Sequence, residues 1–226
     1  GSFLIRRNFC ICYTYPRMNE PLKILLMGPQ GSGKGTQAEI LSEQFGIPAF
    51  GMGQLIRDEV ASGSEYGKKL EAIINKGDLV SDEDAAGLLK LRLERPDTNK
   101  GYILDGYPRN MGQFNAFNFD SPTHVIVYEI PRDESLKRLG GRLTCAACGK
   151  VTSVSSGVSA GDDCSCGDKW IVRNDDTPEA ITRRLEIYEN DTQPVIEQYK
   201  EIVHRIDGVG TIEEVSTRTF SAISVQ

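Results

Sequence analysis

The run from Gly28 to Thr36, GPQGSGKGT, carries the residue types that a phosphate-binding loop needs. Glycines let backbone N–H groups point into one concavity and approach an anion closely, and Lys34 supplies a point charge for the outer phosphates. The spacing fits G-x-x-x-x-G-K with one departure: Gly35 follows the lysine, and the hydroxyl comes one place later, at Thr36. A glycine-rich loop with an incidental lysine is the alternative, but four glycines with a lysine and a threonine favour phosphate binding.

Asp105 is the second candidate functional residue. Asp105 ends the apolar run Tyr102–Leu104 and opens the sequence DGYPR, which closes with Arg109. Ligands of parallel sheets bind beyond the carboxyl ends of the strands. An aspartate there is placed to hold Mg²⁺, directly or through water, against bound phosphates. Asp-Gly is also a common turn pair, so a turn or helix-capping role for Asp105 is the alternative.

A set of arginines is the third candidate feature for phosphate chemistry. Phosphoryl transfer needs cationic, bidentate donors around the charge that spreads over the phosphate oxygens. Four arginines bracket a segment, 141–174, that shows no helical periodicity. If this segment closes, it would carry them onto a substrate. Each arginine taken singly is more readily a solvated surface residue, so only the joint pattern indicates a function. The set is Arg57, Arg109, Arg138, Arg142, Arg173 and Arg184.

Four of the six cysteines cluster inside the same segment, at Cys145, Cys148, Cys164 and Cys166. In a cytosolic enzyme such a cluster binds metal more often than it forms disulfides. Four thiolates, or three with the carboxylate of Asp163, can make a tetrahedral zinc site. Zinc would hold together a segment too small and too serine-rich to build a core. A disulfide and an empty, redox-sensitive cluster are the alternatives.

Apolar runs that alternate with helical patterns must position these residues. The predicted strands are 22–27, 48–50, 102–104, 124–130 and 203–206, and the predicted helices are 38–45, 54–61, 66–75 and 81–94. Ser81, with Asp84 three residues on, is a candidate helix N-cap. The alternation indicates the α/β class, with a parallel sheet buried between helices on both faces. His124 and His204, at strand edges, are expected to pack or to make surface hydrogen bonds.

The bulk composition limits the partners. The chain has 226 residues, enough for one α/β domain with an insertion or for two small domains. Its net charge of −6 disfavours a nucleic-acid role driven by backbone electrostatics, and no run approaches the roughly 18 apolar residues of a membrane span. Residues 1–21 are expected to be a disordered or appended tail, and Met18 is a candidate natural start. A cytoplasmic location is expected.

From about Leu22 to Ile223 the chain resembles the adenylate kinases of the nucleoside-monophosphate kinase family. The matching stretches are GSGKGTQ at 31–37, DGYPR at 105–109 with Gln113 four residues on, and RNDD at 173–176. The family's own Gly-Lys-Gly-Thr accounts for the departure in the phosphate loop. The resemblance implies a three-layer α/β/α fold of the P-loop class. It also implies a monomer that converts ATP and AMP, with Mg²⁺, into two ADP.

The resemblance further implies a division of the chain and roles for single residues. The core would comprise 22–50, 81–140 and 175–226, the helical monophosphate-binding flap 51–80, and the inserted lid 141–174. Catalytic roles would fall to Lys34, Asp105, Arg109, Arg142, Arg173 and Arg184. ATP would contact Gly31, Ser32, Gly33, Lys34, Gly35, Thr36, Arg138, Arg142, Val151 and Thr152. AMP would contact Met52, Arg57, Asp78, Leu79, Val80, Gly106, Tyr107, Pro108, Arg109, Gln113, Arg173 and Arg184. The acidic pair of the lid, which engages arginines on closure, would be Asp175 and Asp176.

The flap departs from the family pattern. It has Met52-Gly53-Gln54 where Ser/Thr-Gly-Asp is usual, so a hydroxyl close to the acceptor base is lost. Base discrimination is then open, because polar contacts carry most of it. Gln113 keeps AMP as the favoured acceptor, since its amide offers both a donor and an acceptor to a base. The alternatives are a kinase for another monophosphate, such as UMP, CMP or the GTP:AMP type, and a non-catalytic nucleotide-binding protein.

The cysteines also depart from the pattern. Zinc-binding lids of this family have two C-x-x-C pairs, and Cys145-Ala-Ala-Cys148 fits the first. The second pair, Cys164-Ser165-Cys166, is one residue short and has Asp163 where a cysteine is expected. The resemblance therefore implies structural zinc but leaves open which side chains complete its coordination.

Overall fold

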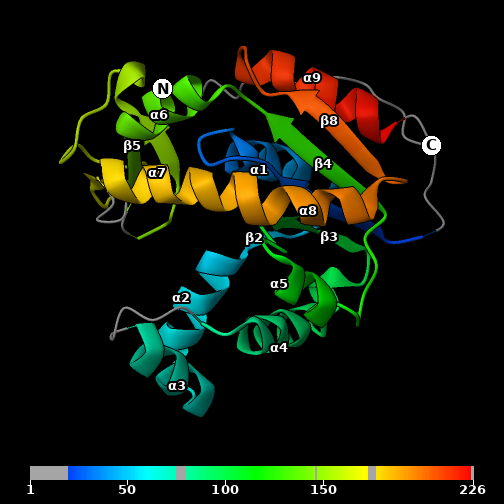
Figure 1. The fold of residues 1–226 in the computed structure, drawn as a ribbon. Helices are drawn as coiled ribbons and strands as arrows, with labels where there is room; N and C mark the ends of the chain where they lie inside the picture. Colours follow the sequence, from blue (N-terminus) through cyan, green and yellow to red (C-terminus); the bar gives the residue numbers. More distant parts are fainter. Residues whose placement is uncertain (1–19, 75–79, 146, 173–176, 225–226) are drawn as a thin grey trace, which may run out of the picture.

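The computed structural model describes residues 20–74, 80–145, 147–172 and 177–224. Its main sheet has five parallel strands in the order β2-β3-β1-β4-β8 (Figure 1). They are β2 (Ala49–Gly51), β3 (Gly101–Asp105), β1 (Leu22–Met27), β4 (His124–Glu129) and β8 (Val203–Asp207). The predicted α/β class with a parallel sheet is confirmed. The predicted strand limits differ from the observed ones by no more than one residue at either end.

The strands are apolar on both faces because both faces are covered. Along β1, Ile24 and Leu26 point into one apolar cluster and Leu25 and Met27 into the other, and all four are buried. This is the alternation that a strand imposes on successive side chains. Burying each such side chain contributes roughly 2 kcal/mol. A polar substitution in the middle of β1 would therefore place an unpaired polar group in the core.

Helices form the two outer layers. On one face lie α1 (Lys34–Phe45) and α9 (Ile212–Ile223), whose Phe45 and Phe220 rings meet edge to face with centroids 6.1 Å apart. The cluster on the other face is closed by α2 (Met52–Ser62), α3 (Glu65–Ile74), α4 (Asp82–Leu93), α5 (Met111–Ala116) and α8 (Gln193–Ile196). In Figure 1, α2 and α3 project from the body at the lower left. The three-layer arrangement agrees with the predicted fold class.

Local signals in the sequence set the ends of α4. The Ser81 hydroxyl accepts a hydrogen bond from the N–H of Asp84 at 3.0 Å and caps the helix, as predicted. The helix ends at Leu93, one residue before the predicted limit, with Glu94 as its C-cap. The remaining helical segments are η1 (Pro96–Thr98), α6 (Arg132–Gly140), α7 (Pro178–Ile187), the π-helical η3 (Tyr188–Thr192) and η4 (Glu197–Tyr199).

A small second sheet interrupts the main fold between α6 and α7. It is antiparallel, in the order β6-β5-β7, and consists of β6 (Val151–Ser153), β5 (Arg142–Cys145) and β7 (Trp170–Ile171), with the short η2 (Val154–Ser156) after β6. Figure 1 places it at the left end of the molecule, behind α7. The sequence predicted an insertion without helical periodicity here. None of the described helices could span a membrane.

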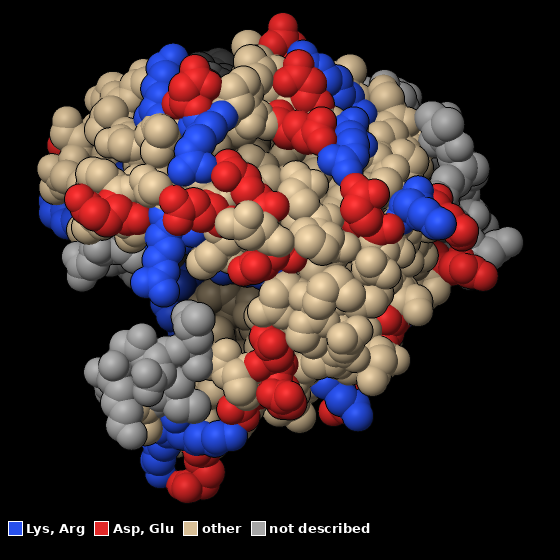
Figure 2. Space-filling view, viewed as in Figure 1, with Lys and Arg blue, Asp and Glu red and all other residues tan. Residues whose placement is uncertain are grey.

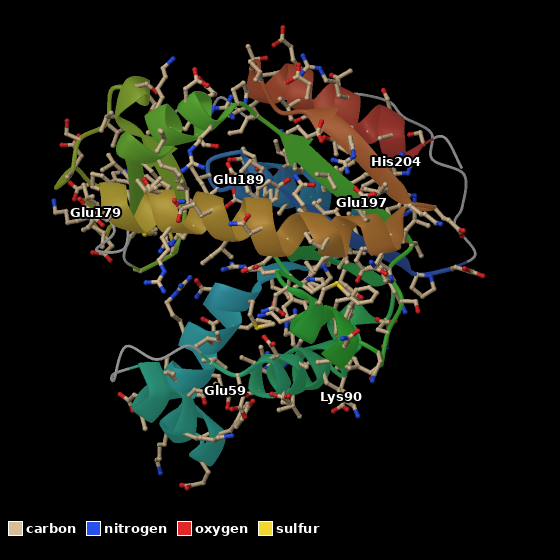
Figure 3. The ribbon with its side chains drawn as sticks, viewed as in Figure 1. Glu59, Lys90, Glu179, Glu189, Glu197 and His204 are labelled. Atoms are coloured by element: carbon tan, nitrogen blue, oxygen red, sulfur yellow. The ribbon has the colours of Figure 1, made fainter. Side chains whose placement is uncertain are left out.

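The two histidines pack against each other, which is one of the two predicted alternatives. His124 opens β4 and is fully buried, and its ring stacks on that of His204 with centroids 6.1 Å apart. Figure 3 shows His204 on β8, the neighbouring edge strand. The Nδ1 atom of His124 lies 2.9 Å from Oγ1 of Thr123. The Nε2 atoms of both rings are buried without a hydrogen-bond partner among the described residues. Parallel pairing of β4 with β8 brings these rings together.

This pair is expected to make stability depend on pH. Burial, and secondarily His204, lower the pKa of His124, whereas the unfolded chain takes up a proton near pH 6.5. Below that pH the unfolded state binds more protons, so the free energy of unfolding decreases as pH falls, by up to about 1.4 kcal/mol per pH unit from this group. Urea unfolding at pH 7.5 and 5.5 should show a larger loss for wild type than for His124→Leu. Equal losses would contradict the interpretation.

Candidate active site

The loop between β1 and α1 closes around the ammonium group of its own lysine. Lys34 Nζ donates to the carbonyl oxygens of Gly28 and Pro29, both at 2.8 Å, and to Oγ of Ser32 at 3.3 Å. Gly28 has a φ of 137°, and a Cβ there would collide with the carbonyl oxygen of Tyr128. Only glycine fits that position. The predicted phosphate loop is therefore a concave backbone turn with a cation at its centre.

The environment of Lys34 is cationic, with one carboxylate. Desolvation lowers the pKa of Lys34 to about 8, Arg109 and Arg142 act in the same direction, and Asp105 opposes them. Asp105 stands beside the loop, since a Cβ on Gly35 would lie 3.9 Å from its Oδ2. Its Oδ1 is buried without a hydrogen-bond partner among the described residues, and burial raises its pKa despite Lys34 and Arg109. An orphaned carboxylate oxygen beside a phosphate loop fits a hard divalent cation held through water.

Two arginines from later elements reach the same loop. Arg138 on α6 donates from Nη1 to the carbonyl oxygen of Gly31 at 3.3 Å and from Nη2 to that of Gly208 at 3.1 Å. Arg184 on α7 donates from Nη1 to Oε1 of Gln30 at 3.3 Å. Figure 2 shows lysine and arginine side chains at the hollow between the part of the molecule that carries α7 and the part that carries α2 and α3. The structure thus brings together cations that the sequence separates widely.

The remaining predicted residues lie in the loop, in α1, in β5 or outside the described part of the chain. Gly31, Ser32 and Gly33 continue the loop, and Gly35 and Thr36 stand in the first turn of α1. Arg142 opens β5 opposite Ser153 of β6. The predicted residues Arg173, Asp175 and Asp176, like Asp78 and Leu79, lie outside the described part of the chain.

The segment after β3 forms the neighbouring wall. Arg109 Nε donates to the carbonyl oxygen of Gly106 at 2.7 Å, and the Arg109 N–H donates to Oε1 of Gln113 at 2.9 Å. Asn110 caps α5 by accepting from the N–H of Gln113 at 2.7 Å. Tyr107 is buried and joined to Pro108 by a cis peptide bond. The amide oxygen of Gln113 thus has a partner already, whereas its amide N–H groups donate to none of the described residues.

The flap residues divide between core and surface. Met52 begins α2 and is buried in the apolar cluster that also contains Leu55. A methionine at this position therefore contributes to packing. Arg57 is exposed on α2, and its Nη2 donates to Oε1 of Gln54 at 2.6 Å. Val80 is half-buried against the same cluster as Met52.

The four clustered cysteines come together as a candidate metal site. Their Sγ atoms all lie within 4.8 Å of one another, with 3.4 Å between Cys145 and Cys166 and 3.7 Å between Cys148 and Cys164. All four are free thiols. Four sulfurs at such distances fit tetrahedral coordination of one Zn²⁺. Asp163, the alternative ligand, instead has its Oδ1 2.6 Å from Lys169 Nζ.

The small sheet beside this cluster carries the predicted base-contacting residues. Val151 is exposed on β6, and Thr152 pairs with Leu143 of β5. The turn after Cys148 approaches the flap, because a Cβ on Gly149 would lie 3.7 Å from Oε1 of Gln54. The insertion thus comes close to the start of α2 at this point.

Sequence reasoning missed Glu134 and Gly208 as partners of Arg138, and Gln30 as a partner of Arg184. Glu134 accepts from Arg138 Nε at 2.7 Å, and the i,i+4 spacing on a helix is the signal that indicates such a pair. Gln30 and Arg184 are 154 residues apart, so no local sequence pattern could indicate the hydrogen bond between them.

The fold and this loop define a P-loop nucleotide-binding protein. The family model for adenylate kinase matches residues 26–204. The chain is 38% identical to the adenylate kinase of Thermodesulfovibrio yellowstonii over 204 residues, which cover 86% of this chain and 95% of the relative. It is also 38% identical to the adenylate kinase of Archaeoglobus fulgidus over 207 residues, covering 86% and 94%. The chain belongs to the adenylate kinase family.

Proposed function

We propose that the protein transfers the terminal phosphoryl group of ATP reversibly to AMP, giving two ADP, and so serves adenine nucleotide homeostasis. The observation that carries this function is the convergence of Lys34, Arg138 and Arg184 on one phosphate loop. In this family, such an arrangement suits a polyphosphate whose charge must be neutralised during transfer.

The roles of single residues follow as part of the proposal. The loop from Gly31 to Thr36 binds the ATP phosphates, with Val151 and Thr152 near the base or ribose. Lys34, Arg138, Arg142, Arg173 and Arg184 hold the donor and transferring phosphates. Arg57 and Arg109 hold the AMP phosphate. The AMP base lies against Met52, Val80, Gln113, the backbone of Asp78 and Leu79, and the segment Gly106–Pro108.

Catalysis by this set is positioning and electrostatic stabilisation. No side chain needs to act as a strong base, because proton transfer is not the difficult part of a loose phosphoryl transfer. The lid (141–174) and the flap (51–80) close over the core (22–50, 81–140 and 175–226), and closure keeps water from replacing AMP as the acceptor. Asp175 and Asp176 engage arginines in the closed state.

Two metal ions complete the proposal. Mg²⁺ would bind together with ATP, and Asp105 would hold the ion through water. The bound ion would neutralise part of the phosphate charge. Zn²⁺ would be held by Cys145, Cys148, Cys164 and Cys166 and would supply the stability that the small lid sheet lacks. The protein acts as a monomer in the cytoplasm.

Initial rates with ATP and each of AMP, UMP, CMP and GMP test this function. AMP should exceed every other acceptor in kcat/KM by at least about 100-fold. Because Met52 replaces the usual hydroxyl residue, another monophosphate kinase is the competing function, and a higher kcat/KM for UMP, CMP or GMP would establish it. ATP binding without turnover of any acceptor would indicate a non-catalytic nucleotide-binding protein.

A further inference from the structure

Gln30 occupies a position in the phosphate loop to which the sequence assigns no role. It stands between Pro29, whose carbonyl oxygen accepts from Lys34, and Gly31, whose carbonyl oxygen accepts from Arg138. Its own side-chain oxygen accepts from Nη1 of Arg184 at 3.3 Å, and the contact is partly buried. Three consecutive residues of one loop thus each accept a hydrogen bond from a different cationic side chain.

The scaffold that brings Arg184 to the loop is well defined. Helix α7 is capped by Thr177, whose Oγ1 accepts from the N–H of Ala180 at 3.2 Å. The apolar side of α7, through Ile181 and Leu185, packs on Leu139 of α6. Because α6 is itself tied to the loop through Arg138, the base of the Arg184 side chain is fixed relative to the loop. The guanidinium at its far end still has several rotatable bonds to be restrained.

Arg109 contributes a like charge near that guanidinium. Desolvation lowers the pKa of Arg109, and Arg184 contributes to the lowering, so the two charges interact. Arg109 in turn acts on Lys34. Repulsion among these groups favours arrangements that turn Arg184 away from the loop. An acceptor in the loop counteracts this tendency. A neutral amide does so without cancelling the positive charge that phosphates require.

We propose that Gln30 is a positioning residue: its amide oxygen holds the Arg184 guanidinium at the phosphate loop, in place for the transferring phosphoryl group. The inference rests on the proposed function, in which Arg184 touches that group. A glutamate could hold the guanidinium more firmly, but it would place a negative charge where the phosphates bind. An aliphatic side chain would leave the guanidinium without its acceptor in the loop.

Steady-state kinetics of Gln30→Leu test the proposal. The kcat should fall about tenfold, the worth of one hydrogen bond to a charged group, while KM for ATP and for AMP stays within about twofold, because the contact matters most in the transition state. Gln30→Glu should also lower kcat and should raise KM for ATP. Gln198→Leu, at an exposed glutamine whose side chain donates to the Pro194 carbonyl oxygen at 3.4 Å, is the matched control and should behave as wild type.

A double-mutant cycle separates positioning from a general loop defect. In an Arg184→Ala background, Gln30→Leu should change kcat by less than about twofold, because the group it positions is gone. A tenfold loss in that background too, or wild-type kcat for Gln30→Leu, would overturn the proposal while leaving the function intact. If Gln30→Leu has a lower Tm than wild type, Gln30→Asn replaces it as the test. The asparagine side chain is one methylene shorter, so its amide should no longer reach Arg184 and kcat should still fall. An unchanged kcat for Gln30→Asn would refute the role. Failure of wild type to turn over AMP would instead overturn the proposed function.

Discussion

Replacing Lys34 by methionine is expected to lower kcat for phosphoryl transfer by about 10³-fold, the size of effect that follows removal of one preorganised donor to transition-state charge. The ammonium is the only side-chain cation in the run 28–36. It already lies 2.8 Å from two carbonyl oxygens at the centre of the loop. Methionine keeps a similar length and removes both the charge and the N–H donors.

The same substitution should leave the fold intact. Desolvation lowers the pKa of Lys34 to about 8, so folding disfavours its charged form at pH 7 relative to the unfolded chain. Removing that charge is therefore expected to leave Tm unchanged or to raise it. A coupled kinetic assay and a thermal melt measure both effects, with Lys90→Met, an exposed lysine on α4 (Figure 3), as control. More than a tenth of wild-type kcat in Lys34→Met would contradict the role.

The second large effect is expected from the cysteine cluster. Wild-type protein should contain close to one equivalent of zinc, and Cys145→Ser should lose most of it, because this buried cysteine would be one of the four ligands. Loss of a structural zinc removes much of the free energy that orders a small lid. The apparent Tm should fall by about 5–10 °C, and kcat/KM for ATP by at least about tenfold. Elemental analysis, thermal melts and kinetics measure these changes.

Asp163→Asn is the matched control for that experiment. The Asp163 carboxylate pairs with Lys169 on the lid surface, and such exposed pairs contribute little to stability. The variant should keep its full zinc content and its Tm within about 2 °C of wild type. Loss of zinc from Asp163→Asn with retention in Cys166→Ser would assign the fourth ligand to the carboxylate. Zinc below about half an equivalent in wild type, with four titratable lid thiols, would refute the metal site.

Much of this fold was predictable because its signals are local. The apolar run 22–27, the glycine spacing after it and the Ser81 cap each lie within a few residues, and each was predicted correctly. The carboxyl end of β3 placed Asp105 beside the loop by a general rule of parallel sheets. The cysteine cluster followed from the positions of four cysteines within one short segment, although the spacing of the second pair left the ligand set open.

The rest depends on contacts between distant parts of the chain. The stacked pair of His124 and His204 requires that β8 lie next to β4 in a particular register, which no local pattern reveals. The hydrogen bond from Arg184 to Gln30 requires α7 to pack on α6 with the Ile181 and Leu185 side of the helix turned toward Leu139. Met52, predicted to remove a hydroxyl from the acceptor site, also packs in the apolar cluster that α2 covers, a contribution that no local pattern indicated.

A crystal structure with a bisubstrate analogue, in which the ATP and AMP moieties share one phosphate chain, would show whether the loop at 28–36 and the arginines bind the phosphates. Lys34 Nζ and the guanidinium groups of Arg138, Arg142 and Arg184 are expected within about 3.2 Å of phosphate oxygens, with the lid closed over them. Phosphates bound away from the loop at 28–36, or those guanidinium groups far from the phosphates in a closed complex, would contradict this expectation.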